Sequence, residues 1–273
     1  YLYWVEYAEG AEYRRWYRKA VADGAATELI LDEVALAEGK DYFSLSACSI
    51  SNNGRLLAYS YDDDGSERFT VRVRDLATGA LLPDVIADTL SDIVWSADDS
   101  SFLYARVNAQ WRTDQIRLHA LGSAQDDDVL IFAEADEGFR VGVGETSSEA
   151  WILLSTGDHE TSEVWMVPAA DPLAQPVCVA PRQKGREYSV DEHDGTLFIV
   201  TNDTHVNFRL VTAPVTDPGA WVERIAPSDA FYLTDVVTFR DFFVVEGRKD
   251  GLDQIAVHDY ADPTKITPIL FPE

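Results

Sequence analysis

The segment Cys48-Ser-Ile-Ser-Asn-Asn-Gly-Arg-Leu-Leu-Ala-Tyr-Ser-Tyr61 has the pattern of a β-hairpin. Two β-rich runs, Leu45 to Ser51 and Arg55 to Tyr61, flank Asn52-Asn53-Gly54. These three residues tolerate the positive φ angles that a tight turn requires. The segment therefore predicts two antiparallel strands joined by a short turn.

The same pattern recurs along the chain. Ile93 to Arg106 repeats it as a short apolar strand, a Ser/Asp turn and a second strand, and weaker copies begin near Val141, Tyr188 and Val236. Successive copies start 45 to 48 residues apart. A repeat of this length made of strands is typical of propeller blades. We therefore expect an all-β protein with the β-propeller fold.

Each repeat predicts four strands. The complete units are expected at about 44–87, 90–134, 138–181, 186–226 and 231–273. The first unit is shorter, with strands at Leu2 to Tyr7, Tyr13 to Lys19 and Thr27 to Leu31. Residues 32–39 predict a short helix, with Asp32 as its N-cap and Gly39 just past its end.

Composition limits the class of partner. The 273 residues carry a formal net charge of −26, which leaves no surplus of basic residues for nucleic acid. An acidic surface can steer cationic ligands, although solubility alone would also explain the charge. No run of about 18 apolar residues predicts a membrane span. Because Cys48 and Cys178 fall in different repeats, we expect no disulfide and a cytoplasmic location.

Motifs of hydrolytic, nucleotide and metal chemistry are missing from the sequence: there is no G-x-S-x-G, H-E-x-x-H, P-loop or C-x-x-C. Five scattered histidines are expected at turns or strand surfaces. The acidic turns at 62–65 and 126–128 favour solvated hairpin tips over calcium sites. Most tryptophans are expected to pack between blades. No catalytic residue, metal or cofactor is predicted.

Seven ordered segments resemble the N-terminal propeller of the oligopeptidase B group, in the prolyl oligopeptidase family of serine peptidases. They are Asp32–Phe43, Asn53–Ser60, Arg74–Gly79, Thr161–Val164, Glu187–Asp191, Asn207–Leu210 and Gly251-Leu252. Their ordered succession along nearly the whole chain is more specific than any single motif.

This resemblance implies a seven-bladed propeller that covers an α/β-hydrolase domain and admits short peptides to it. In such enzymes the catalytic Ser, Asp and His follow the last blade, and members like oligopeptidase B cleave after Arg or Lys. The chain opens on Tyr1 without an initiator Met and stops at Glu273. We therefore expect residues 1–273 to be an incomplete propeller, about five blades plus part of the first, without the catalytic domain and inactive alone.

Two residues are candidates for facing the substrate. The strand around Thr161–Trp165 is similar to one that contributes to the substrate pocket in a prolyl-specific relative, which singles out Glu163 and Trp165. Alternation places these two on one face of the sheet and Ser162 and Val164 on the other. Packing between blades is the competing interpretation of both side chains.

Two other functions stay open at this point. A free-standing propeller could bind another protein through one face, and a propeller enzyme could carry catalytic carboxylates or histidines at its own central channel. The expected partners under the preferred interpretation are the hydrolase domain of the same protein and short basic peptides.

Overall fold

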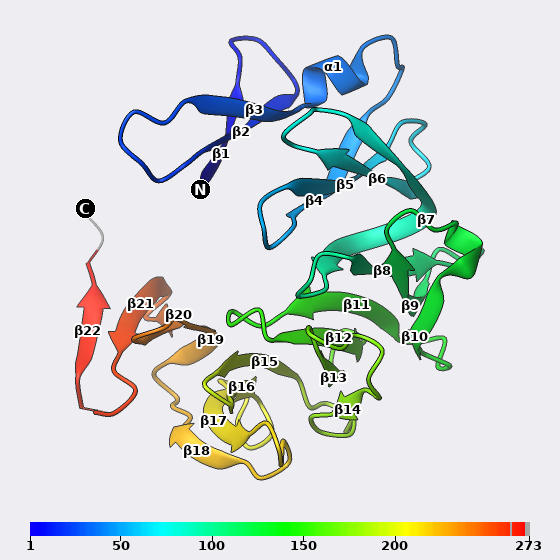
Figure 1. Cartoon of the computed structure of the whole chain (residues 1–273). Coiled ribbons are helices and arrows are strands. Elements are labelled where there is room, and N and C mark those ends of the chain that lie inside the picture. The colour runs from blue at the N-terminus through cyan, green and yellow to red at the C-terminus, as the bar shows by residue number, and fades with distance from the viewer. Residues whose placement is uncertain (263, 271–273) are drawn as a thin grey trace. The chain divides into compact units, whose positions relative to one another are not determined.

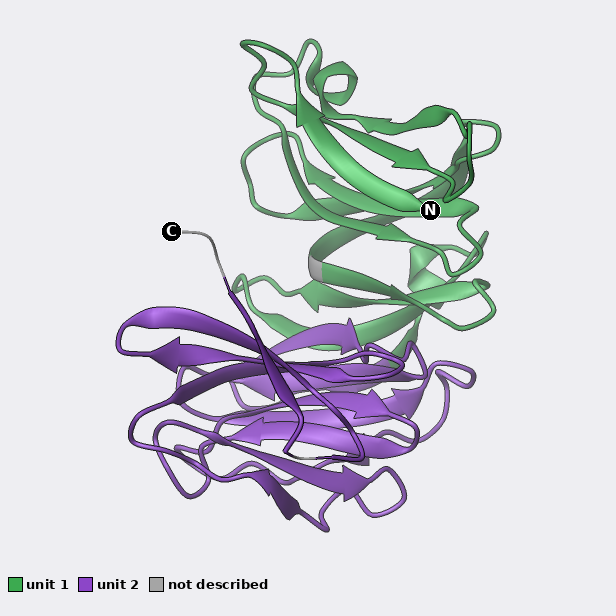
Figure 2. Ribbon diagram, turned by 90° about the vertical axis from the view of Figure 1, so that its left-hand side faces the viewer, with its two compact units in different colours: residues 1–130 green, residues 131–273 purple. Residues whose placement is uncertain are grey.

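The computed structural model describes residues 1–262 and 264–270, and the chain divides into two compact units, residues 1–130 and 131–273 (Figures 1 and 2). Antiparallel β-sheets make up almost all of the regular secondary structure in both units, which confirms the all-β class. Residues 271–273, the end of the sixth expected repeat, lie outside the described residues.

The first unit begins with a three-stranded sheet of β1 (Leu2–Tyr7), β2 (Arg14–Lys19) and β3 (Thr27–Asp32). Helix α1 (Glu33–Ala37) follows, and the Asp32 carboxylate caps it by accepting a hydrogen bond from the amide of Ala35 at 3.2 Å. The expected helix and its cap are thereby confirmed. Within the described residues, no helix is long and apolar enough to cross a membrane.

A seven-stranded sheet follows, in the order β10-β9-β8-β7-β6-β5-β4. Its strands are β4 (Ser44–Ile50), β5 (Leu56–Asp62), β6 (Phe69–Asp75), β7 (Leu81–Trp95), β8 (Ser101–Val107), β9 (Thr113–Ala120) and β10 (Val129–Ala133). The last strand crosses the boundary between the units. A single 3₁₀ turn, Gln125–Asp127, precedes β10.

Strand β7 differs from the prediction of two separate strands in this region. It is continuous over 15 residues and belongs to two successive repeats. Thr89 pairs with Phe69 on β6 and with Arg106 on β8, so backbone pairing passes from one repeat to the next without a break. A positive φ of 53° at Asp88 and shifts in register accommodate the bend. Register shifts and bends of this kind cannot be recognised from the alternation of apolar and polar residues in the sequence.

The second unit contains three four-stranded sheets, each with its strands in chain order. The first holds β11 (Arg140–Glu145), β12 (Trp151–Gly157), β13 (Ser162–Pro168) and β14 (Val177–Cys178). The second holds β15 (Tyr188–His193), β16 (Thr196–Thr201), β17 (Arg209–Pro214) and β18 (Val222–Ile225). The third holds β19 (Tyr232–Thr238), β20 (Phe243–Lys249), β21 (Leu252–His258) and β22 (Ile266–Ile269).

The core of the second unit lies between these successive sheets. Val164 and Met166 of β13 pack against Leu197 and Ile199 of the next sheet. Aromatic side chains fill the edges of this layer, where Trp151 and Trp221 are partly buried, and Trp95 lies in the core of the first unit. The expected packing role is confirmed for these three tryptophans.

Buried aspartates join the turns of neighbouring repeats within each unit. In the first unit Asp99 accepts hydrogen bonds from the backbone amides of Asn52 and Asn53 at 2.7 and 3.0 Å. In the second unit Asp191 accepts bonds from the amides of Ser147 and Thr238, both at 2.7 Å. Each bond spans 44 to 47 residues, about one repeat. The turns of adjacent repeats are therefore held together by carboxylates.

Candidate functional site

Strand β13 presents the two predicted residues on the same face of its sheet. The indole Nε1 of Trp165 donates a hydrogen bond to Glu163 Oε1 at 2.9 Å. Ser162 on the opposite face exchanges hydrogen bonds with the backbone of Tyr188 in the next sheet. The predicted alternation of these side chains is confirmed.

Glu163 is part of a cluster of ion pairs that we call the Arg182 cluster, formed by Glu134, Glu163 and Arg182. The Glu163 carboxylate accepts bonds from the Arg182 backbone amide at 2.6 Å and from its guanidinium at 3.1 Å. The same guanidinium bonds to Glu134, which also accepts a bond from Thr156 Oγ1 at 2.7 Å. Glu134 and Glu163 are only 8% and 6% exposed, so both charges are largely withdrawn from water, and both pair with the Arg182 guanidinium.

The pKa values of this cluster favour the ionised forms. Burial raises the pKa of Glu163, but hydrogen bonds from Arg182 and Trp165 outweigh it and bring the pKa below its ordinary value. The same balance of burial against the Arg182 bond lowers the pKa of Glu134. The bond to Glu134 in turn raises the pKa of Arg182. A carboxylate held in this way is ionised near neutral pH and has no proton to donate, so the cluster does not suit general acid catalysis.

Trp165 is half-buried, and its ring lies 5.7 Å from that of Phe132. The side-chain partners of both predicted residues thus lie in β10, in β13 and in the link between β14 and β15. Whether either residue also faces a peptide stays a prediction.

A hollow of about 350 Å³ lies on the opposite face of β13. We call it the Asp158 hollow. Its walls come from all three sheets of the second unit and include Asp158, Ser162, Glu187, Tyr188, Phe208 and Tyr232. It combines two carboxylates with three aromatic rings, and no Lys or Arg lines it. Sequence analysis did not single it out, because its residues are spread over more than 70 positions and only folding brings them together.

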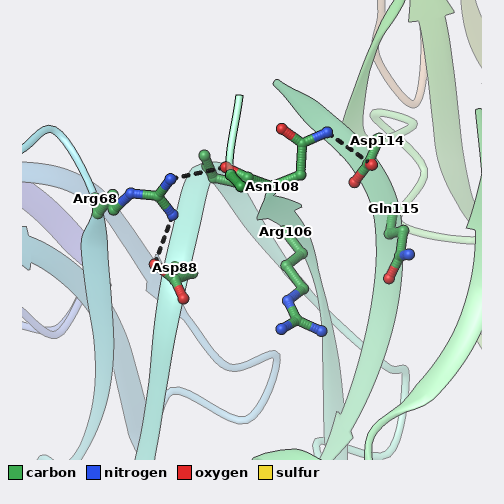
Figure 3. Close-up of a pocket in the computed structure, with 8 residues that line it drawn as sticks. Arg68, Asp88, Arg106, Asn108, Asp114 and Gln115 are labelled. Carbon is green, nitrogen blue, oxygen red and sulfur yellow. Dashed lines mark hydrogen bonds and ion pairs between the residues drawn. The ribbon is translucent and has the colours of Figure 1, made fainter. Parts of the chain in front are cut away.

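A second hollow, of about 420 Å³, lies in the first unit (Figure 3). Arg68 donates hydrogen bonds to Asp88 and to the carbonyl of Asn108, both at 2.8 Å, and the Asn108 amide donates to Asp114 at 2.8 Å. The guanidinium of Arg106 forms no hydrogen bond or ion pair with the residues that the structure describes. The charges of this hollow are therefore nearly balanced, with one guanidinium available.

The turn residues considered for metal binding have partners of their own. The Asp62 carboxylate accepts hydrogen bonds from the amides of Asp64, Gly65 and Glu67 at 2.7 to 3.0 Å, so it caps the β5–β6 turn. In the described part of the chain, no group of three or more His, Cys, Asp or Glu side chains could hold a metal ion.

One histidine differs from its prediction as a surface residue. His119 is fully buried, with Nδ1 2.7 Å from Asp128 Oδ1 and Nε2 2.9 Å from Asp84 Oδ1. Tyr104 also donates to Asp128, at 2.7 Å. The sequence around His119 gives no local sign of such partners, since β9 mixes polar and apolar residues and Asp84 is 35 residues away in sequence.

The two cysteines carry free thiols. Burial raises the pKa of Cys48 to about 12 and that of Cys178 to about 11. Both therefore remain protonated near neutral pH, which makes them weak nucleophiles.

Comparison with known proteins identifies the fold and the family. Residues 1–269 match the family described as prolyl oligopeptidase, N-terminal beta-propeller domain. Dipeptidyl aminopeptidase BI of Pseudoxanthomonas mexicana is 33% identical over 242 residues, and Protease 2 of Moraxella lacunata is 32% identical over 244. These alignments cover 87% and 88% of this chain but 33% and 35% of the relatives. The chain thus spans about a third of the length of the curated relatives it matches.

Solved structures agree with this match. Oligopeptidase B from Leishmania major superposes with a TM-score of 0.91 at 25% identity, and the enzyme from Trypanosoma brucei with covalently bound antipain superposes with 0.90 at 27%. Each superposition covers 99% of this chain and 40% of the other. The predicted β-propeller fold is thereby confirmed.

Proposed function

Because this chain belongs to the family of prolyl oligopeptidase N-terminal β-propeller domains, we propose that it is the propeller of a serine peptidase similar to oligopeptidase B. The propeller admits short peptides to an α/β-hydrolase domain elsewhere in the same protein, which cleaves after Arg or Lys. The observation that carries this proposal is the family match over residues 1–269, supported by the likeness to two oligopeptidase B structures.

The charge of the chain supports a basic substrate. A net charge of −26 creates a negative potential that attracts cationic peptides and raises their rate of association. Salt screens this attraction over about 8 Å at physiological ionic strength. Association with an Arg-containing peptide should therefore slow steeply as salt is added, and a rate that does not depend on salt would exclude steering.

The proposal is tested with the full gene product that contains this chain. Reporter peptides ending in Arg, Lys, Pro or Ala measure the residue preference, and a series from a tripeptide to a folded protein, each with one Arg site, measures the size limit. We expect cleavage after Arg and Lys that falls as the substrate lengthens. Equal cleavage of the tripeptide and the folded protein would contradict gating, and equal cleavage after all four residues would contradict the preference for basic residues.

Absence of any peptide cleavage by the full product would instead favour a protein-binding propeller. In that case a binding partner, rather than a substrate, would be sought on the same faces. The cytoplasmic location also remains a proposal; it rests on the sparse use of cysteine, and cell fractionation tests it.

Glu163 and Trp165 are proposed to lie at the edge of the peptide path. The Arg182 cluster fixes the link between β14 and β15, and this link supplies Glu187 to the Asp158 hollow. Replacing Trp165 by leucine removes the indole bond to Glu163 and should raise KM for Arg peptides with little change in kcat. An unchanged KM would remove Trp165 from the path.

A further inference from the structure

We propose that the Asp158 hollow binds the cationic side chain of an Arg or Lys residue located away from the bond that is cut. This inference rests on the proposed function, because it assigns part of the recognition of basic peptides to the propeller. It names a site within this chain for a guanidinium or ammonium group, with two carboxylates and aromatic rings as its ligands.

Asp158 supplies a carboxylate that is fixed in place. Its Oδ1 atom accepts hydrogen bonds from the backbone amides of Glu160 and Thr161 at 2.9 and 2.8 Å, within the turn between β12 and β13. The bond from the Glu160 amide is the main cause that lowers the pKa of Asp158. Oδ2 has no hydrogen-bond partner among the described residues, so it can accept a bond from a ligand.

Glu187 supplies the second carboxylate from the link before β15. Its backbone amide donates to Asn202 Oδ1 at 2.8 Å, and Asn202 Nδ2 donates to Glu187 Oε1 at 3.2 Å. Oε2 has no partner within the described part of the chain. Two carboxylates with available oxygens in one hollow match the several donors of a guanidinium group.

The aromatic wall suits the flat face of the same cation. The rings of Phe208 and Tyr232 meet edge to face at 5.7 Å, and Tyr232 is 41% exposed. Phe208 has a φ of 61°, an unusual conformation for a bulky residue. The carbonyl of Asn207 accepts a bond from the Leu233 amide at 3.0 Å, which ties this turn to β19. A cation over such rings is attracted to their negative faces.

Each cation near the hollow has a partner within the chain, and for Arg186 this partner is Tyr188, one of the residues that line the hollow. Arg209 pairs with Asp203 at 2.8 Å, and Arg248 pairs with Asp253 at 2.9 Å. Arg186 lies over the ring of Tyr188, with its guanidinium carbon 5.4 Å from the ring centroid. No Lys or Arg of the described chain therefore occupies the hollow, and its negative charge is left for a ligand.

Binding is measured on this chain alone, by NMR titration with N-acetyl-arginine amide and with its neutral isostere N-acetyl-citrulline amide. We expect the arginine probe to shift the amide signals of Ser189 and Thr234, which line the hollow. Asp158→Asn keeps the turn bonds but removes the charge, and Tyr232→Leu removes the ring. Each should weaken binding about fivefold, whereas Glu160→Gln, a matched change in the same turn, should leave it within about twofold.

Equal binding of the two probes, or equal weakening by Asp158→Asn and Glu160→Gln, would overturn the site. This result is independent of catalysis. If the full protein cleaves after Arg but the chain does not bind the arginine probe, the proposed function stands and the site fails. If the chain binds the probe and Asp158→Asn weakens it, while the full protein cleaves nothing, the site stands and the peptidase proposal fails.

Discussion

Replacing Asp191 by asparagine should destabilise the second unit by about 3 kcal/mol. The carboxylate is 9% exposed and accepts bonds from Ser147 N, Ser147 Oγ, Glu192 N, Thr238 N and Thr238 Oγ1, at 2.7 to 2.9 Å. In the variant the side-chain amide oxygen still accepts bonds from some of these donors. The NH2 group replaces the other carboxylate oxygen, so the donors that bonded to that oxygen now face another donor. The hydroxyls can turn to accept, whereas the Thr238 amide cannot.

The magnitude follows from these bonds. A buried backbone amide left without an acceptor costs about 1–3 kcal/mol. The bonds that remain are also weaker, by roughly 0.5–1 kcal/mol each, because their acceptor is no longer charged. Thr238→Val removes only one hydroxyl donor and should cost about 1 kcal/mol.

Asp194→Asn is the matched control for this prediction. It makes the same chemical change three residues away, on a side chain that is 91% exposed, and asparagine tolerates the φ of 46° at that position. Urea unfolding followed by tryptophan fluorescence measures all three variants, and a loss of about 3 kcal/mol should lower the midpoint by about 1–2 M. Equal midpoints for Asp191→Asn and Asp194→Asn would refute the view that this carboxylate holds neighbouring sheets together.

Three further predictions concern buried polar groups. Arg182→Met should destabilise the protein by about 2–3 kcal/mol at pH 7. Because the carboxylates of the Arg182 cluster have lowered pKa values, the difference in stability from wild type should shrink as pH falls below about 4. Urea unfolding at several pH values measures this difference, and a difference that does not change with pH would contradict the prediction. His119→Leu leaves two buried carboxylates without their partner and should lower the free energy of unfolding by about 3 kcal/mol. The control His159→Leu, at an exposed position, should change it by no more than about 0.5 kcal/mol. Equal melting temperatures of the two variants would contradict this prediction. Cys48 and Cys178 should react slowly with a disulfide-exchange reagent at pH 8 in the folded protein and rapidly in urea, and rapid reaction of folded protein would show that their thiols are accessible as thiolates.

The strands could be predicted from sequence because their signals are local. Turn residues such as Asn53-Gly54 and the alternation in β6 lie within a few positions of the strands they define, and β1 has the predicted bounds. The sequence did not predict that β7 is one continuous strand, because the predicted strands ended where one repeat appeared to end. The bend of β7 depends on pairing with two neighbours at once.

The site was harder to predict because its contacts join distant positions. Alternation correctly placed Glu163 and Trp165 on one face, but Arg182, the main partner of Glu163, lies 19 residues further on in an irregular link. Asp158 and Tyr232 line the same hollow from different sheets, and neither carries a motif. No local pattern in the sequence pairs them.

The continuous strand β7 limits which blades can separate. Because Thr89 is paired by its backbone on both sides, parting the two repeats that share β7 would break a sheet in its interior. The sheets of the second unit are joined instead by apolar packing and by side-chain bonds, among them those of Asp191 to both of its neighbours. If a peptide enters by the parting of neighbouring blades, a seam crossed by side-chain contacts should open more readily than the backbone-paired seam at β7.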